Sequence, residues 1–432
     1  MATPMDREFK FFRLQTERQL NHWHTAAHTL RRHDLIASPE AWAALEQYVG
    51  ARLRESLNAT CEHLLKVFDV VRAQFVAARS LADLDRVADG IVHFRAQFAR
   101  VETTVHFYGD AISSRTNPEV GARLRAMDYI AGVSMRPTLE PLNKPIPPVL
   151  VYLNKGLGAS ILRAGLRLWD GFTTSPVAAV SVTYHNQERP TAIIHETGHQ
   201  VAAILGWNEE LARLLLSNLH DVDPRCANLW AQWASEIAAD AYGFANVGFA
   251  AVAALSDVVG GSPAQTFLFN PDGVHPISYI RVLLGFAMAR RFYGRGIWDE
   301  LEYAWRARYP LRSAPQGLQP LLAQLEHQVP RIVDLTLLTP MRCFGSKSLA
   351  ERIDPDRVSP NQLLSLEHEA GPTLATSPHW IAKESLRLIA LVGYRFATSP
   401  EKSDQLVASH RAIMQRLGHA ISPFKKGETT PS

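Results

Sequence analysis

Arg-Pro-Thr-Ala-Ile-Ile-His-Glu-Thr-Gly-His-Gln-Val-Ala-Ala, residues 189–203, is the segment from which the fold and the chemistry of this chain are predicted. Pro190 suits the start of a helix, where its missing N–H costs no hydrogen bond. Positions i and i+4 lie on the same face of a helix, so we expect His195 and His199 to project side by side. Glu196 follows the first histidine, about 100° around the helix axis.

Two imidazoles at this spacing can both reach one Zn²⁺ at about 2.0–2.1 Å. A bound zinc ion lowers the pKa of a water molecule to about 7, and a neighbouring carboxylate can take the proton of that water. Glu196 is placed for this role without displacing either histidine. The alternative is a surface helix whose two histidines and glutamate are simply solvated.

A catalytic zinc ion usually has three protein ligands and one open position, so a third ligand must come from elsewhere. A metzincin would have glycine at 202 and histidine at 205, but the chain has Ala202 and Leu205 there. A second helical pattern, over residues 227–243, is almost entirely small or apolar and carries Glu236 and Asp240 at i and i+4.

Because buried carboxylates without partners are costly, Glu236 and Asp240 should have specific partners. One carboxylate on the metal and one accepting the N–H of a ligand histidine would satisfy both. The alternative is that both carboxylates form salt bridges with arginines elsewhere in the chain.

The combination of His-Glu-x-Gly-His at 195–199, Glu-x-x-x-Asp at 236–240 and His-Pro-x-x-x-x-Arg at 275–281 resembles the gluzincin clan of zinc metallopeptidases. It is similar to soluble relatives of the CAAX-prenyl and HtpX-type endopeptidases, over residues 175–295. The membrane members of that group have spanning helices that are not evident here.

The resemblance implies specific roles for the residues of these motifs. His195, His199 and Glu236 would be the zinc ligands, Glu196 the general base, and Asp240 the carboxylate that supports the site. His275 and Arg281 would lie near the metal, where they would support Asp240 or stabilise an oxyanion. The resemblance also implies that the strand at 177–183 is the sheet edge along which an extended peptide binds.

Composition narrows the classes of partner and compartment. Lysine and arginine nearly balance the acids, with a formal net charge of +3, so we expect no nucleic-acid partner. The three cysteines are far apart in the sequence and odd in number, which favours a reducing, cytoplasmic location. Residues 1–10 are polar and charged, so we expect no secretory signal.

The most apolar stretch, residues 244–259, is shorter than a membrane span requires and contains Asn246 and Asp257. We therefore expect no membrane span, and we expect this stretch to continue the helix of Glu236 through the core.

The predicted fold class is mainly α (α+β), with a small sheet. We expect a helical N-terminal region (1–138), a zincin-like core (139–310), a helical C-terminal region (311–422) and a disordered tail (423–432). The core should contain strands at 149–153 and 177–183, with a helix that follows a glycine-rich turn and extends to Trp169. Tyr242 and Tyr279 are candidate oxyanion donors, although core packing is the commoner use of such residues.

The predicted function is a zinc-dependent hydrolase that cleaves a peptide or protein substrate. Two alternatives remain open at this point. One is that the zincin-like core is a metal-stabilised helical scaffold that binds a protein partner without turnover. The other is that the metal serves hydrolysis of another kind of bond.

Overall fold

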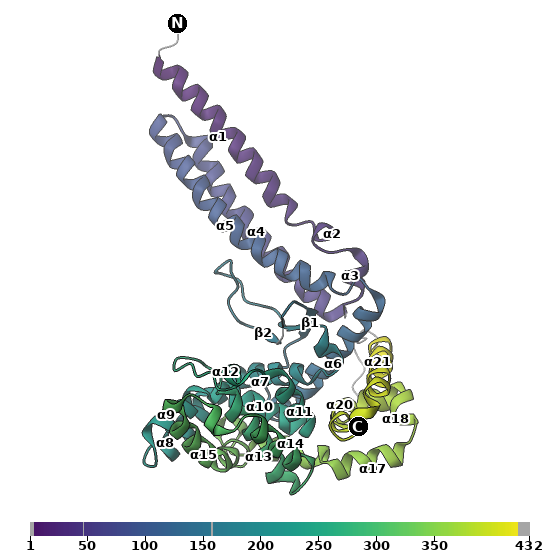
Figure 1. The fold of residues 1–432 in the computed structure, drawn as a ribbon. Helices are drawn as coiled ribbons and strands as arrows, with labels where there is room; N and C mark the ends of the chain where they lie inside the picture. The colour runs from purple at the N-terminus through teal and green to yellow at the C-terminus, as the bar shows by residue number, and fades with distance from the viewer. Residues whose placement is uncertain (1–3, 46, 157–158, 422–432) are drawn as a thin grey trace. The chain divides into compact units, whose positions relative to one another are not determined.

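The computed structural model describes residues 4–45, 47–156 and 159–421. The protein is mainly α-helical with one small three-stranded sheet (Figure 1), as predicted. The chain groups into two compact units. The first contains residues 1–121 and 164–177, and the second contains residues 122–163 and 178–421. The predicted division into three regions stays a prediction, and the predicted tail at 423–432 lies outside the described residues.

The first unit is built on three long helices that lie side by side in Figure 1. A capping box begins the last of them, since Ser80 accepts the backbone N–H of Asp83 and the Asp83 carboxylate accepts that of Ser80. Residues 164–177 return to this unit, where the Ser175 hydroxyl lies 2.7 Å from the Tyr108 hydroxyl. The helices are α1 (Pro4–Thr29), α2 (His33–Ile36), α3 (Pro39–Ala43), α4 (Gln47–Ala77) and α5 (Leu81–Ser113).

The sheet lies in the second unit and has the order β1-β3-β2. β1 (Val149–Leu153) pairs parallel to β3 (Ala178–Val182), and β2 (Ser160–Leu162) pairs antiparallel to the other side of β3. All five β3 residues are buried, as expected for a β-branched and alanine-rich central strand. The two predicted strands are confirmed.

Two expectations about this region are wrong. The segment after the glycine-rich turn forms β2 and an irregular loop rather than a helix to Trp169. The strand at 177–183 was expected at the sheet edge, but β3 is central because β2 covers its outer side. The edge strands of the described sheet are therefore β1 and β2.

Two helices carry the motif residues and cross closely. They are α7 (Thr191–Leu205) and α10 (Ala234–Val247). The crossing is possible because position 198 is glycine: a Cβ there would lie 3.0 Å from the Ala239 Cα and 3.1 Å from the Tyr242 Cβ. The Tyr242 hydroxyl donates to the Ser134 carbonyl at 2.5 Å, which ties α10 to α6 (Pro118–Leu139). The predicted helix over 189–203 is confirmed, with a shift of two residues.

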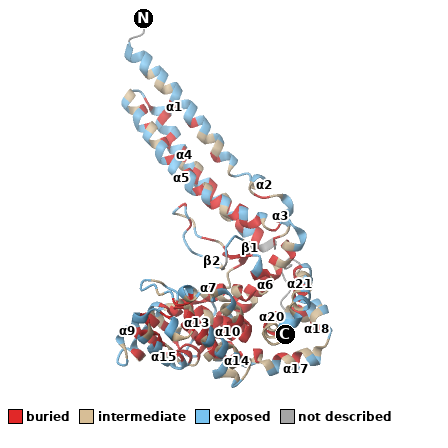
Figure 2. Ribbon diagram, in the orientation of Figure 1, coloured by how far each residue is buried: buried red, intermediate tan, exposed pale blue. Residues whose placement is uncertain are grey.

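The expectation of one continuous helix from residue 227 to 259 is wrong. Trp233 leaves helical geometry and separates α9 (Pro224–Gln232) from α10. Gly248, with φ +60°, separates α10 from α11 (Phe249–Val259). A Cβ at position 248 would lie 2.8 Å from the Val358 carbonyl oxygen, so both the backbone angle and the close approach require glycine. Most residues of α10 are buried (Figure 2).

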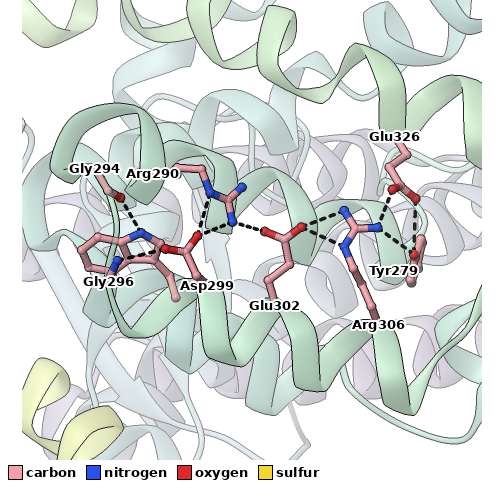
Figure 3. Close-up of polar contacts among 9 residues, drawn as sticks. Tyr279, Arg290, Gly294, Gly296, Asp299, Glu302, Arg306 and Glu326 are labelled. Carbon is pink, nitrogen blue, oxygen red and sulfur yellow. Dashed lines mark hydrogen bonds and ion pairs between the residues drawn. The ribbon is translucent and has the colours of Figure 1, made fainter.

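An ionic network braces α13 (Ser278–Tyr293) against α14 (Ile297–Arg308) and α15 (Gln319–Leu337) (Figure 3). Arg290 bridges Asp299 and Glu302, with its Nη2 2.6 Å and 2.5 Å from their carboxylate oxygens. Arg306 then joins Glu302 to Glu326, which accepts the Tyr279 hydroxyl at 3.3 Å. Alternating charges along three helices fix the position of α13.

The remaining elements cover the core of the second unit. Two of these helices begin directly after a serine, at the Ser-Pro pairs 359–360 and 377–378. No helix within the described residues has both the length and the apolar character needed to cross a membrane.

The remaining helices are α8 (Trp207–Leu219), α12 (Pro263–Thr266), α16 (Leu349–Arg352), α17 (Pro360–Ala370), α18 (Thr373–Thr376), α19 (Pro378–Lys383), α20 (Ser385–Thr398) and α21 (Ser403–Ala420). The 3-10 turns are η1 (Glu140–Leu142), η2 (His185–Gln187), η3 (Leu311–Ser313), η4 (Gln316–Leu318), η5 (Arg342–Phe344), η6 (Pro355–Val358) and η7 (Pro400–Lys402).

Candidate metal centre

The structure brings together the three side chains that the sequence proposes as metal ligands. The His195 Nε2 lies 3.6 Å from the Glu236 Oε2, and the His199 Nε2 lies 3.4 Å from the Glu236 Oε1. One ligand atom from each of the three residues lies within 4.8 Å of the others. Ligands at about 2.0–2.1 Å from a tetrahedral zinc ion lie about 3.3 Å from one another, so these separations fit a single small cation.

Each histidine has a partner for its other ring nitrogen. The His195 Nδ1 lies 2.9 Å from the Asp240 Oδ1, and the His199 Nδ1 lies 3.2 Å from the Ser235 hydroxyl. These contacts orient both rings with Nε2 toward Glu236, which is the arrangement that supports a metal-ligating imidazole. The role of Ser235 is not evident from the sequence, although it directly precedes Glu236 in the first turn of α10.

Arg281 connects the two carboxylates. Its Nε and Nη2 donate to the two oxygens of Asp240 at 2.6 Å and 2.8 Å, a bidentate pair. The Arg281 Nη2 also lies 3.0 Å from the Glu236 Oε2. The arginine salt bridge considered from the sequence as an alternative to metal support is therefore present together with the histidine contacts. Arg281 is buried and comes from α13, so a third helix supports the two carboxylates.

The charges of this cluster favour a divalent cation. Glu196, Glu236 and Asp240 contribute three negative charges when ionised, and Arg281 contributes one positive charge. With both imidazoles neutral, as metal binding requires, the difference is two negative charges in a largely buried site, and uncompensated buried charge is costly. Without a metal ion, a proton on His195 offsets part of this charge. Two neutral imidazoles and a carboxylate are also a donor set that zinc accepts. The residues therefore fit a Zn²⁺ ion.

The pKa values reflect these contacts. Burial acts to raise the pKa of Glu236, but the hydrogen bonds with His195 and His199 and the charge of Arg281 hold it far below its usual value. Burial acts to lower the pKa of His195, but its hydrogen bonds with Asp240 and Glu236 raise it to about 9. Burial also acts to raise the pKa of Asp240, but the charge of Arg281 and the contact with His195 lower this pKa to about 2. The two α10 carboxylates are thus ionised throughout the neutral range.

Glu196 lies beside this cluster in the same cavity. It is buried, and burial raises its pKa against the opposing charges of His195 and His199. A raised pKa makes an ionised carboxylate a stronger proton acceptor. Its surroundings therefore suit a general base.

The other candidates occupy different positions. The His275 side chain is 65% exposed, and its Nε2 lies 3.6 Å from the Glu236 Oε1, so it stands at the mouth of the cluster. The Tyr242 hydroxyl is used by Ser134, and the Tyr279 hydroxyl is used by Glu326. Neither tyrosine lines the cavity, so core packing and bracing describe both better than an oxyanion role.

The cluster opens into a cavity of about 460 Å³. One side is formed by residues of α7, and strand β2 contributes Ser160 and Ile161. Further lining residues come from α10, α11, α13 and η2, and from the loop residues Arg189 and His275. Comparisons with protein-family models, with curated proteins and with solved structures find no match for this chain.

Proposed function

We propose that this protein is a zinc-dependent metallopeptidase, a hydrolase of the gluzincin type. One observation carries the proposal: the His195, His199 and Glu236 ligand atoms gather around one point, with Glu196 in the same cavity. His195, His199 and Glu236 would hold the zinc ion. When bound, zinc supplies a Lewis acid that polarises a carbonyl group and lowers the pKa of water.

The chain's own residues would supply proton transfer and orientation. Glu196 accepts the proton of the attacking water on a carboxylate oxygen and returns it to the nitrogen of the leaving amine. Asp240 holds the His195 ring, and Arg281 holds Asp240. His275, exposed at the mouth, is the side chain placed to donate a hydrogen bond to the carbonyl oxygen as its charge develops.

Strand β2 supports a peptide substrate over other hydrolysable compounds. It is the edge of the sheet nearest the cluster, and Ser160 and Ile161 line the cavity. An edge strand offers backbone N–H and C=O groups to an extended peptide, which can add as a further strand. In this proposal β2, rather than β3, holds the substrate backbone.

We place this activity in the cytoplasm. All three cysteines are free thiols, and burial raises the pKa of Cys61 to about 11 and that of Cys226 to about 12. Thiols kept in this form suit a reducing compartment.

The proposal is tested with Glu196→Gln and with metal analysis. The zinc-loaded wild type should cleave members of a peptide library, and a chelator should stop it. Glu196→Gln should retain one zinc ion per chain while turnover falls at least 100-fold, because the proton acceptor is lost. Glu209→Gln, an exposed glutamate on α8, is the matched control and should behave like the wild type. Full turnover in Glu196→Gln, or no zinc bound by the wild type, would refute the proposal.

A further inference from the structure

The apolar helix α11 presents one face to the cavity that contains the metal cluster. Ala251, Ala254, Leu255 and Val258 all line this cavity. Their spacing of i, i+3, i+4 and i+7 places them on a single stripe of the helix. The stripe is therefore a continuous apolar surface facing the metal ligands.

Another face of α11 is already used for packing. Ala250 and Ala253 lie against α20, and a Cβ at Gly393 would lie 2.3 Å from the Ala250 Cβ, so the two helices are in close contact. The cavity-facing stripe has no such cover: Leu255 is only half-buried, and Val258 is 43% exposed. Exposed apolar surface inside a concave site is typical of ligand binding.

The neighbouring parts of the lining are also apolar. They include Leu284, Gly285 and Met288 of α13, which packs against α11, and Ala192 of α7. Within the described residues, Arg189 is the one permanently charged side chain in the lining outside the metal cluster. Its Nη1 lies 2.5 Å from the Asp257 carboxylate, so its charge is compensated. The recess therefore disfavours a charged occupant.

Small side chains leave this recess open. Gly243, Ala251 and Ala254 lie in its lining, where larger residues would fill the space. The recess and the edge strand β2 border the same cavity, so a peptide held along β2 can direct a side chain into the recess. This makes a polypeptide a better occupant than a free apolar compound.

We propose that the α11 stripe is the specificity surface of the enzyme, and that it selects polypeptides with a bulky apolar side chain, such as Leu, Met or Phe, next to the scissile bond. This inference rests on the proposed peptidase function. Ala254 limits the size of the side chain accepted, and Leu255 and Val258 provide its apolar contact.

Cleavage of a matched peptide series tests this inference. Peptides differing only in Gly, Ala, Leu or Phe on either side of the scissile bond are compared by kcat/KM. At one of these positions the zinc-loaded wild type should prefer Leu or Phe over Ala by tens-fold, from the apolar carbons buried. Ala254→Phe should reverse this order. The matched control Ala203→Phe, at an exposed alanine of α7, should keep the wild-type order.

A milder variant guards against misfolding of Ala254→Phe. Leu255→Ala removes apolar contact at a half-buried position and should reduce the preference about tenfold with an unchanged circular dichroism spectrum. A wild type indifferent to side-chain size at both positions, or an unchanged preference in both variants, overturns the inference.

A binding measurement separates failure of the pocket from failure of the peptidase. The neutral fluorescent probe N-phenyl-1-naphthylamine is titrated into chelator-treated wild type, Ala254→Phe and Ala203→Phe. Affinity for one site should fall at least tenfold in Ala254→Phe alone. If this holds but no peptide is cleaved, the apolar site stands and the peptidase proposal fails. If peptides are cleaved but probe binding is equal in all three proteins and the peptide order does not change, the inference fails by itself.

Discussion

Replacing Gly198 with alanine tests how closely the two ligand-bearing helices must approach. The new Cβ would lie 3.0 Å from the Ala239 Cα and 3.1 Å from the Tyr242 Cβ, closer than ordinary van der Waals contact. The nearest atom belongs to the backbone of α10, so relief requires the helices to separate by a few tenths of an ångström. His199 lies on α7 and Glu236 lies on α10, so the distance between these two ligands increases when the helices separate.

Two opposing effects set the size of the change in stability. Alanine in a helix interior is favoured over glycine by about 1 kcal/mol. Overpacking a tight contact costs about 1–3 kcal/mol. We expect Gly198→Ala to lower the free energy of unfolding by about 1 kcal/mol. Zinc affinity should fall about tenfold, because the ligands on α7 and α10 no longer meet at the best separation.

Gly132→Ala is the matched control for this substitution. Gly132 lies within α6, and within the described residues a Cβ there would have no heavy atom within 4 Å apart from its chain neighbours and the adjacent backbone of α6. This variant should be up to about 1 kcal/mol more stable than the wild type, with unchanged zinc affinity. Urea denaturation gives the stabilities, and competition with a chromophoric chelator gives the affinities. Equal stability gains in the two variants, with equal zinc affinity, would show that the crossing is not tight and refute the reasoning.

Three further outcomes are expected. Asp240→Asn should weaken zinc binding about 10- to 100-fold in a chelator competition, because His195 loses its anionic partner. Unchanged zinc affinity would show that Asp240 does not support the metal site. Zinc at 1,000 times its dissociation constant should stabilise the fold by about 4 kcal/mol in thermal unfolding, and Glu236→Gln should lose most of this gain. Burial lowers the pKa of His410 to about 4, with Glu188 opposing and Arg123 assisting, whereas the unfolded value is 6.5. The unfolded chain therefore binds more protons than the folded protein below pH 6.5, and the free energy of unfolding should fall by about 2 kcal/mol from pH 7 to pH 5. Urea titrations at both pH values should show no such loss for His410→Gln. An equal loss in the variant would contradict the argument.

Local signals in the sequence predict the positions of the site residues well. The i and i+4 spacing places His195 and His199 on one face of α7, where the structure has them. The buried character of residues 227–243 indicates that Glu236 and Asp240 need partners, and they have them. These predictions succeed because helical periodicity and the cost of buried charge are properties of nearby residues.

Features that depend on distant contacts were not predictable in the same way. Val358 packs against Gly248 and helps to end α10, although a run of apolar residues suggests that the helix continues. β2 becomes a strand because β3 offers an unpaired side, not because its three residues favour extension strongly. The Ser235 contact with His199 depends on the break at Trp233, which sets where α10 begins.

The break at Gly248 also affects how this protein can change. It separates α10, which carries Glu236 and Asp240, from α11, which carries the apolar stripe. Substitutions along α11 can reshape what the cavity accepts while the charged residues of the preceding helix keep their positions. For the proposed peptidase, selectivity and bond cleavage can therefore be engineered, or diverge in evolution, as independent traits.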